Sequence, residues 1–98
     1  MRVFVSSEGA AIGPQILAYA EFRMFSALAR YPAVQRAQVR FRHDAERKVR
    51  CSVVIDLEDG PPAKAHASGP HAGVTIDRAA EQVVRLMRRR FQPDTVGA

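Results

Sequence analysis

Cysteine and metal-binding motifs are almost absent from this sequence. Cys51 is its only cysteine, so a disulfide within the chain and a cysteine-rich metal site are both excluded. The histidines, His43, His66 and His71, have no cysteine or acidic partner at ligand spacing. A Walker loop, a dinucleotide-binding glycine pattern and a zinc-ligand pair are also missing. We therefore expect no metal, no cofactor and no small-molecule substrate, and we interpret the histidines as surface residues.

The residue set of an enzyme active site is missing as well. No acid, base, nucleophile and oxyanion donor can be assembled from the sequence. Cys51 alternates with Val49 and Val53, a pattern typical of a small core residue. A nucleophilic cysteine would need a basic, partly exposed setting instead. We expect no catalytic residue and no enzymatic activity.

Long apolar runs are lacking too. No stretch approaches the roughly 18 apolar residues that a membrane-spanning helix needs. We also find no basic-then-apolar leader, no tandem repeat and no low-complexity segment. We expect a cytoplasmic protein with no membrane partner. The composition predicts one folded domain over residues 1–91, followed by a flexible tail over residues 92–98 that has little to bury.

Acidic residues and lysine are scarce beside arginine. The chain has 15 basic and 10 acidic residues, a net charge of +5, and only Lys48 and Lys64 among the basic residues are lysine. A sequence pI of about 10.3 is a first indication of nucleic-acid binding. Guanidinium groups also match phosphate oxygens in pairs. The same bias fits a GC-rich genome and a solvated basic surface without a partner, and the sequence leaves these alternatives open.

The arginines concentrate in the last predicted helix, over residues 77–91. Apolar residues recur there at steps of three and four, which predicts one buried stripe. That stripe comprises Ile76, Ala80, Val83, Met87 and Phe91. Arg78, Arg85, Arg88 and Arg89 lie away from it, on the solvent side. We interpret Asp77, near the predicted start, as a partner of the N-terminal helix dipole.

Strand and turn patterns predict the rest of the fold. Period-two alternation is clearest over residues 49–57, where apolar and polar side chains take turns. The other predicted elements are strands over residues 2–6, 37–42 and 63–68, and a helix over residues 14–30. The order β-α-β-β-β-α indicates an α+β fold, a four-stranded sheet with two helices on one face.

Two basic surfaces and one apolar surface follow from this fold. The helices carry one basic surface, and the open sheet face carries the other. That face would expose Arg40, Arg42, Arg50, Lys64 and His66. The sequence does not decide which of the two would meet a nucleic acid. Phe22 and Phe25 fall outside the apolar stripe of the first helix, so they either pack between layers or face a partner chain.

Several stretches resemble one family. Residues 19–31, YAEFRMFSALARY, are similar to the first helix of the ribosome hibernation promoting factors, also called the sigma-54 modulation protein family, which reads roughly YAExRxxxALxR followed by an aromatic. Residues 34–40 and 51–57 resemble strands two and three of that family, and residues 75–80 resemble the motif that opens its second helix. His71 and Gly73 stand where many relatives have Asp and Tyr.

The resemblance implies a double-stranded-RNA-binding-like fold and a protein that binds the small ribosomal subunit between head and body. Such a protein idles the ribosome under stress and does no chemistry. We predict RNA-binding side chains on both helices: Arg23, Arg30, Arg78, Arg85, Arg88, Arg89 and Arg90. The alternative is a divergent member that acts as a homodimer or protein-interaction module without binding the ribosome.

Overall fold

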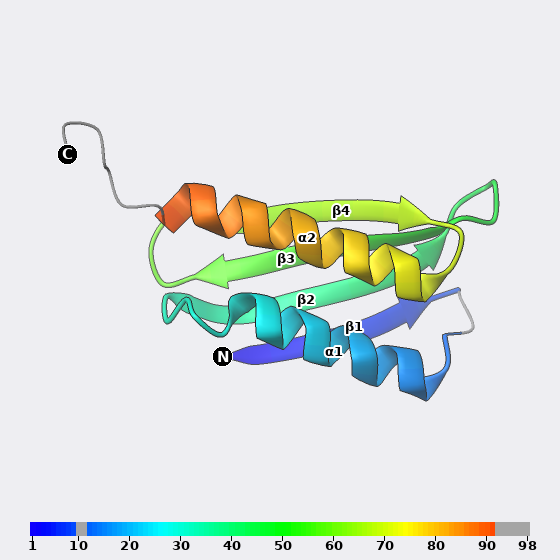
Figure 1. Ribbon diagram of the computed structural model, residues 1–98, viewed down its shortest axis with the longest axis horizontal. Coiled ribbons are helices and arrows are strands. Elements are labelled where there is room, and N and C mark those ends of the chain that lie inside the picture. Colours follow the sequence, from blue (N-terminus) through cyan, green and yellow to red (C-terminus); the bar gives the residue numbers. More distant parts are fainter. Residues whose placement is uncertain (10–11, 92–98) are drawn as a thin grey trace.

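The computed structural model describes residues 1–9 and 12–91. Its elements follow the predicted order, two helices and four strands (Figure 1). They are β1 (Arg2–Glu8), α1 (Pro14–Leu28), β2 (Val34–His43), β3 (Val49–Leu57), β4 (Ala63–Gly69) and α2 (Ala72–Phe91). The tail predicted over residues 92–98 lies outside the described residues, and the single-domain assignment over residues 1–91 stays a prediction. No helix among the described residues is long and apolar enough to cross a membrane.

The four strands form one mixed sheet in the order β1-β2-β3-β4. β1 pairs in parallel with β2, and the β2–β3 and β3–β4 pairs are antiparallel. Parallel neighbours need a crossover, and α1 supplies it between β1 and β2. Short turns join β2, β3 and β4 into an antiparallel meander. The predicted α+β fold class is therefore confirmed.

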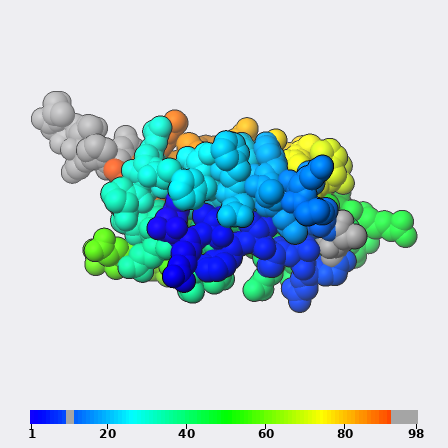
Figure 2. Space-filling model, turned by 90° about the horizontal axis from the view of Figure 1, so that it is seen from below, coloured from blue at the N-terminus to red at the C-terminus, as the bar shows by residue number. Residues whose placement is uncertain are grey.

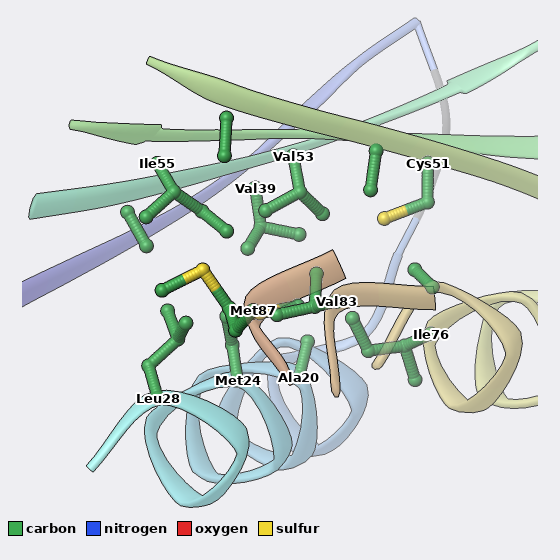
Figure 3. Close-up of a cluster of buried hydrophobic side chains, with 14 of the residues drawn as sticks. Ala20, Met24, Leu28, Val39, Cys51, Val53, Ile55, Ile76, Val83 and Met87 are labelled. Carbon is green, nitrogen blue, oxygen red and sulfur yellow. The ribbon is translucent and has the colours of Figure 1, made fainter. Parts of the chain in front are cut away.

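Both helices cover the same face of this sheet, with α1 over the β1–β2 side and α2 over the β3–β4 side (Figure 1). Strand alternation places Val39, Val53 and Ile55 on the covered face, where they are buried. Figure 3 shows these side chains meeting Met24 and Met87 from the two helices. The open face keeps the alternate, mostly polar side chains.

All elements except β3 differ from the predicted bounds, and the largest differences are at the starts of β2 and α2. β2 begins three residues earlier than predicted, at Val34, through a register irregularity between Val34 and Arg36. α2 begins at Ala72, so Asp77 is not in its first turn. The dipole role predicted for Asp77 is therefore wrong. His71 directly precedes α2, and its Nδ1 accepts a hydrogen bond from the backbone N–H of Val74 at 3.4 Å.

The β2–β3 turn is held by Asp44. Its carboxylate accepts hydrogen bonds from the backbone N–H groups of Glu46 (2.8 Å) and Lys48 (3.0 Å). Loss of hydration alone would raise the pKa of Asp44, but these two donors and the nearby Arg50 outweigh it and hold that pKa below its ordinary value. The turn therefore keeps a fixed carboxylate beside Arg50, with Nε 3.5 Å from Oδ2.

Gly69 allows the start of α2 to approach β4 closely. A Cβ added there would lie 2.8 Å from Oγ1 of Thr75. Thr75 is fully buried, and its hydroxyl lies 2.8 Å from the carbonyl oxygen of His71 and 3.2 Å from that of Val49. It cannot retreat without losing these hydrogen bonds. We expect Gly69→Ala to lower the free energy of unfolding by about 1–3 kcal/mol in urea denaturation.

Gly73→Ala is the matched control for this prediction. A Cβ at Gly73 would meet only the His71 ring at 3.6 Å, an ordinary contact. Gly73 lies within α2, where alanine is the better helix former. Because Gly73 is only the second residue of α2, this variant should change the free energy of unfolding by less than about 0.5 kcal/mol. A loss of similar size in both variants would show that the Thr75 contact does not set the effect.

Candidate nucleic-acid interface

Helix α2 carries the densest group of basic side chains. Residues at three- and four-residue spacing, among them Ile76, Val83 and Met87, are buried against the sheet and α1. This fixes the helix and turns its other side to solvent. Four arginines are exposed there, as the spacing predicted: Arg78, Arg85, Arg88 and Arg89.

The helices run in the same direction, so their C-terminal ends lie at one end of the molecule (Figure 1). The ring of Tyr31, just beyond α1, packs on that of Phe91 with centroids 5.6 Å apart. This contact brings Arg30 to the end that holds the last turn of α2, where Arg88, Arg89 and Arg90 lie. The guanidinium groups offset the partial negative charge of the helix C-termini.

Arg23 joins the two helices through Asp77. One carboxylate oxygen of Asp77 accepts hydrogen bonds from the Tyr19 hydroxyl at 2.6 Å and from Arg23 Nε at 3.0 Å. The bond from Tyr19 lowers the pKa of Asp77, burial opposes this, and Arg23 lowers the pKa further. Together these effects hold the pKa of Asp77 below its ordinary value. Much of the positive charge of Arg23 is thus balanced within the fold.

We expect Tyr19→Phe to move the pKa of Asp77 back toward its ordinary value. A carboxylate whose pKa is lower in the folded state stabilises the fold above its unfolded pKa, near pH 4. This stability is lost as the pH falls through the folded pKa. Stability should therefore depend less on pH in the variant, and an NMR titration of the Asp77 carboxyl carbon should show the higher pKa.

Tyr31→Phe is the matched control, because it also removes a tyrosine hydroxyl. The hydroxyl of Tyr31 forms no side-chain hydrogen bond within residues 1–9 and 12–91. The pKa of Asp77 should not change in this control. An unchanged pKa of Asp77 in Tyr19→Phe would show that the 2.6 Å contact does not govern the carboxylate.

Arg85 shares a shallow groove between the helices with Arg23. The groove has a volume of about 270 Å³ and is also lined by Ala80, Glu81 and Val84. Arg85 Nη2 lies 3.9 Å from Glu81, at the outer limit of an ion pair. Such an exposed contact contributes little, so the charge of Arg85 is only weakly balanced.

Arg78 and Arg90 turn toward the sheet instead of away from it. Arg78 Nη1 donates a hydrogen bond to the carbonyl oxygen of Ser68 at 2.8 Å. Arg90 Nη2 donates one to the carbonyl oxygen of Pro61, also at 2.8 Å. Carbonyl groups leave the positive charge in place, but they fix its position, beside β4 for Arg78 and beside the β3–β4 turn for Arg90.

The predicted RNA-binding arginines therefore do not form one continuous row. Arg23 and Arg85 share the interhelical groove, and Arg30 lies with Arg88 and Arg89 at the C-terminal end of the helices. Arg78 lies beside β4, and Arg90 lies beside the β3–β4 turn. Sequence reasoning assigned Asp77 to the helix dipole and missed its contact with Tyr19 and Arg23. The four-residue spacing of Tyr19 and Arg23 signals a shared helix side, but their partner lies more than fifty residues away.

Cys51 is fully buried, and burial raises the pKa of its thiol to about 12. It is protonated at neutral pH and therefore a poor nucleophile. This confirms the predicted core position of Cys51. His43, His66 and His71 are exposed, as predicted. The absence of enzymatic activity stays a prediction.

The fold and this surface define a class: an α+β protein with a double-stranded-RNA-binding-like arrangement and an arginine-rich helical layer. The family model described as "Sigma 54 modulation protein / S30EA ribosomal protein" matches residues 3–92. The chain belongs to this family, which confirms the resemblance found in the sequence.

Solved structures show the same fold. A ribosomal subunit interface protein from Coxiella burnetii is similar with a TM-score of 0.79 at 15% identity, over 92% of this chain and 98% of that chain. The N-terminal domain of Protein Y from Thermus thermophilus is similar with a TM-score of 0.62 at 21% identity, over 87% and 98%. A comparison with curated proteins gave no match.

Proposed function

We propose that this protein is a ribosome-associated translation inhibitor that binds RNA of the small ribosomal subunit through its helical layer. One observation carries the proposal: the helices direct exposed arginines to solvent at one end, where carboxylates do not neutralise them. Arg30, Arg88 and Arg89 form no ion pair within the described ranges. Family membership supports the ribosome as the partner.

Electrostatic contact with phosphate is the binding mode that this surface supports. An RNA duplex offers phosphates and ribose hydroxyls at regular spacing, and shape governs its recognition. Arginines on rigid helices meet such a surface without a base-reading pocket. The bound protein would occupy space on the subunit and silence translation without chemistry. Its place in the cell would be that of the ribosome, the cytoplasm.

The seven arginines should not contribute equally. Arg85, Arg88, Arg89 and Arg30 carry charge that the fold leaves largely free. Arg23 is balanced by Asp77, so its contribution should be smaller. Arg78 and Arg90 keep their charge but are held by hydrogen bonds to backbone carbonyls of β4 and of the β3–β4 turn, respectively.

Co-sedimentation with purified small subunits at increasing salt tests the proposal. Neutralising several phosphates releases counterions, so binding should fall steeply between about 50 and 200 mM salt. Inhibition of cell-free translation should fall over the same range. If the protein stays in the supernatant at the lowest salt, the proposal is wrong.

A second function, dimerisation or binding of another protein, is supported by the outer side of α1. Phe22 is 66% exposed and Phe25 is 50% exposed. They belong to the helix that lies above β1 in Figure 2. Exposed aromatics three residues apart on one helix are typical of a contact surface. Light scattering tests this: a monomeric mass, with Phe22→Ser leaving solubility unchanged, would count against it.

A further inference from the structure

The open sheet face has a second group of basic residues, at the end where β2 leads into β3. Arg42 and Arg50 are in direct register across these strands, so their side chains share one face. Like charges directly opposite one another destabilise a strand pair. Asp44 balances Arg50 only partly, at 3.5 Å, and Arg42 forms no ion pair within the described part of the chain.

The opposite end of the same face shows how the fold balances such a charge. Arg36 Nη2 lies 2.7 Å from Asp56 Oδ2, and Arg36 Nε donates a hydrogen bond to the same oxygen at 2.8 Å. Asp56 is the register partner of Arg36 on β3. The register partner of Arg42 on β3 is another arginine. This arrangement leaves the Arg42 end without a comparable internal counterion.

A groove lies beside this pair. It has a volume of about 830 Å³ and runs from the open face past β4 to α2. Small polar residues, Ser52 and Ser68, line it between the arginines and leave room for a ligand. Four arginines line it against two carboxylates: Arg42, Arg50, Arg78 and Arg85 against Asp44 and Glu81.

We propose that this groove is a second anion-binding site and that its ligand carries phosphate groups. A phosphate offers three acceptor oxygens, which two guanidinium forks and the serine hydroxyls can share. His66, in register with Ser52, adds a ring nitrogen on the same wall. The groove is positive by only two charges with neutral histidines, so a multiply charged phosphate gains more from it than a carboxylate does.

The Arg42–Arg50 wall of this groove does not depend on the proposed ribosome contact, because both residues lie on the face opposite the helices. Arg78 and Arg85 on the other wall belong to the helical layer as well. The phosphates bound in the groove can come from the backbone of an RNA or from a free anion such as a nucleotide. The groove would bind the phosphate group that both sources have in common. The experiment therefore uses separate probes for the two sources.

The test is an NMR titration of the full chain with inorganic pyrophosphate, with ADP and with a short single-stranded RNA, following backbone amides and arginine Nε–H signals. Signals of Arg42, Arg50 and Ser52 should shift together. Arg42→Gln and Arg50→Gln should each weaken pyrophosphate binding about tenfold. Both side chains are exposed, so the fold should tolerate these changes.

Arg36→Gln is the matched control, with the same charge change on the same face. It should leave pyrophosphate affinity within about twofold, because Arg36 lies outside the groove. Shifts with all three probes support a site for phosphate from either source, and shifts with RNA alone support a backbone-phosphate site. No localised shift with any probe, or an equal loss in Arg36→Gln, would overturn the proposal. Co-sedimentation of Arg42→Gln with the ribosome tests the helical interface separately from this groove.

Discussion

Replacing Arg85, Arg88 and Arg89 together by glutamine is expected to lower affinity for the small ribosomal subunit roughly 100-fold. Each exposed arginine–phosphate contact contributes on the order of 1 kcal/mol, and three such contacts give about two powers of ten. The salt dependence should weaken too, by nearly one unit of log–log slope for each lost contact. Co-sedimentation over a salt series measures both quantities on the same samples.

A control with the same change of charge separates contact from long-range attraction. Arg2, Arg36 and Lys64 are exposed, lie outside the groove beside Arg42 and Arg50, and belong to strands at positions facing away from the helices. Replacing these three by glutamine lowers the net charge equally. This variant should lose much less affinity and keep most of the salt slope. Equal losses in the two triple variants would mean that net charge, and not the helical layer, governs binding.

The strands and the layer arrangement could be predicted because they depend on local periodicity. β3 was predicted with its observed bounds, since apolar and polar residues alternate without a break. Since each strand has one apolar face, both helices had to cover the same side. The prediction fell short at β2, which starts early at Val34, because the register irregularity there depends on pairing with β3.

The exposed side of α2 was predictable in the same way, but the partners of its arginines were not. Arg78 and Arg90 bind carbonyl oxygens of Ser68 and Pro61, groups that every sequence position possesses. Asp77 accepts hydrogen bonds from two residues of α1 that lie more than fifty positions away in the sequence. No helical or strand periodicity relates positions that far apart. Periodicity predicts which side of a helix or strand faces solvent. It does not predict which residues of other elements contact that side.

Basic residues on two faces give the protein two separable electrostatic properties. The helical layer holds arginines whose balance varies from strong, at Arg23, to slight, at Arg85. The open face holds Arg42 and Arg50 next to each other across a strand pair. The sheet lies between Arg42 and Arg50 on one side and Arg88 and Arg89 on the other, whereas Arg85 also lines the groove beside Arg42 and Arg50. Variants of Arg42 and Arg50 therefore report on the open face, and variants of Arg88 and Arg89 report on the helical layer.

Phe41→Ala is expected to cause the largest loss of stability among these variants, about 3–5 kcal/mol. Phe41 is fully buried in a central strand, between Ser7 of β1 and Cys51 of β3, on the face that the helices cover. Removing the ring takes away its apolar contacts and leaves a cavity. The strand cannot move to close this cavity, because β2 is paired with β1 on one side and with β3 on the other. The loss is a large part of the 5–15 kcal/mol typical of a domain, so the melting temperature should fall by roughly 15–30 °C.

Phe4→Ala makes the same change on the other face of the sheet. Phe4 is 49% exposed on β1 and alternates with Val3 and Val5, which pack against the core. This variant should lose less than about 1 kcal/mol in urea denaturation, because the ring already contacts water on much of its surface. Equal losses from Phe4→Ala and Phe41→Ala would mean that the helices do not cover the face assigned to them. The RNA interface would then lose its support, since the outward direction of Arg85, Arg88 and Arg89 follows from how α2 packs on that face.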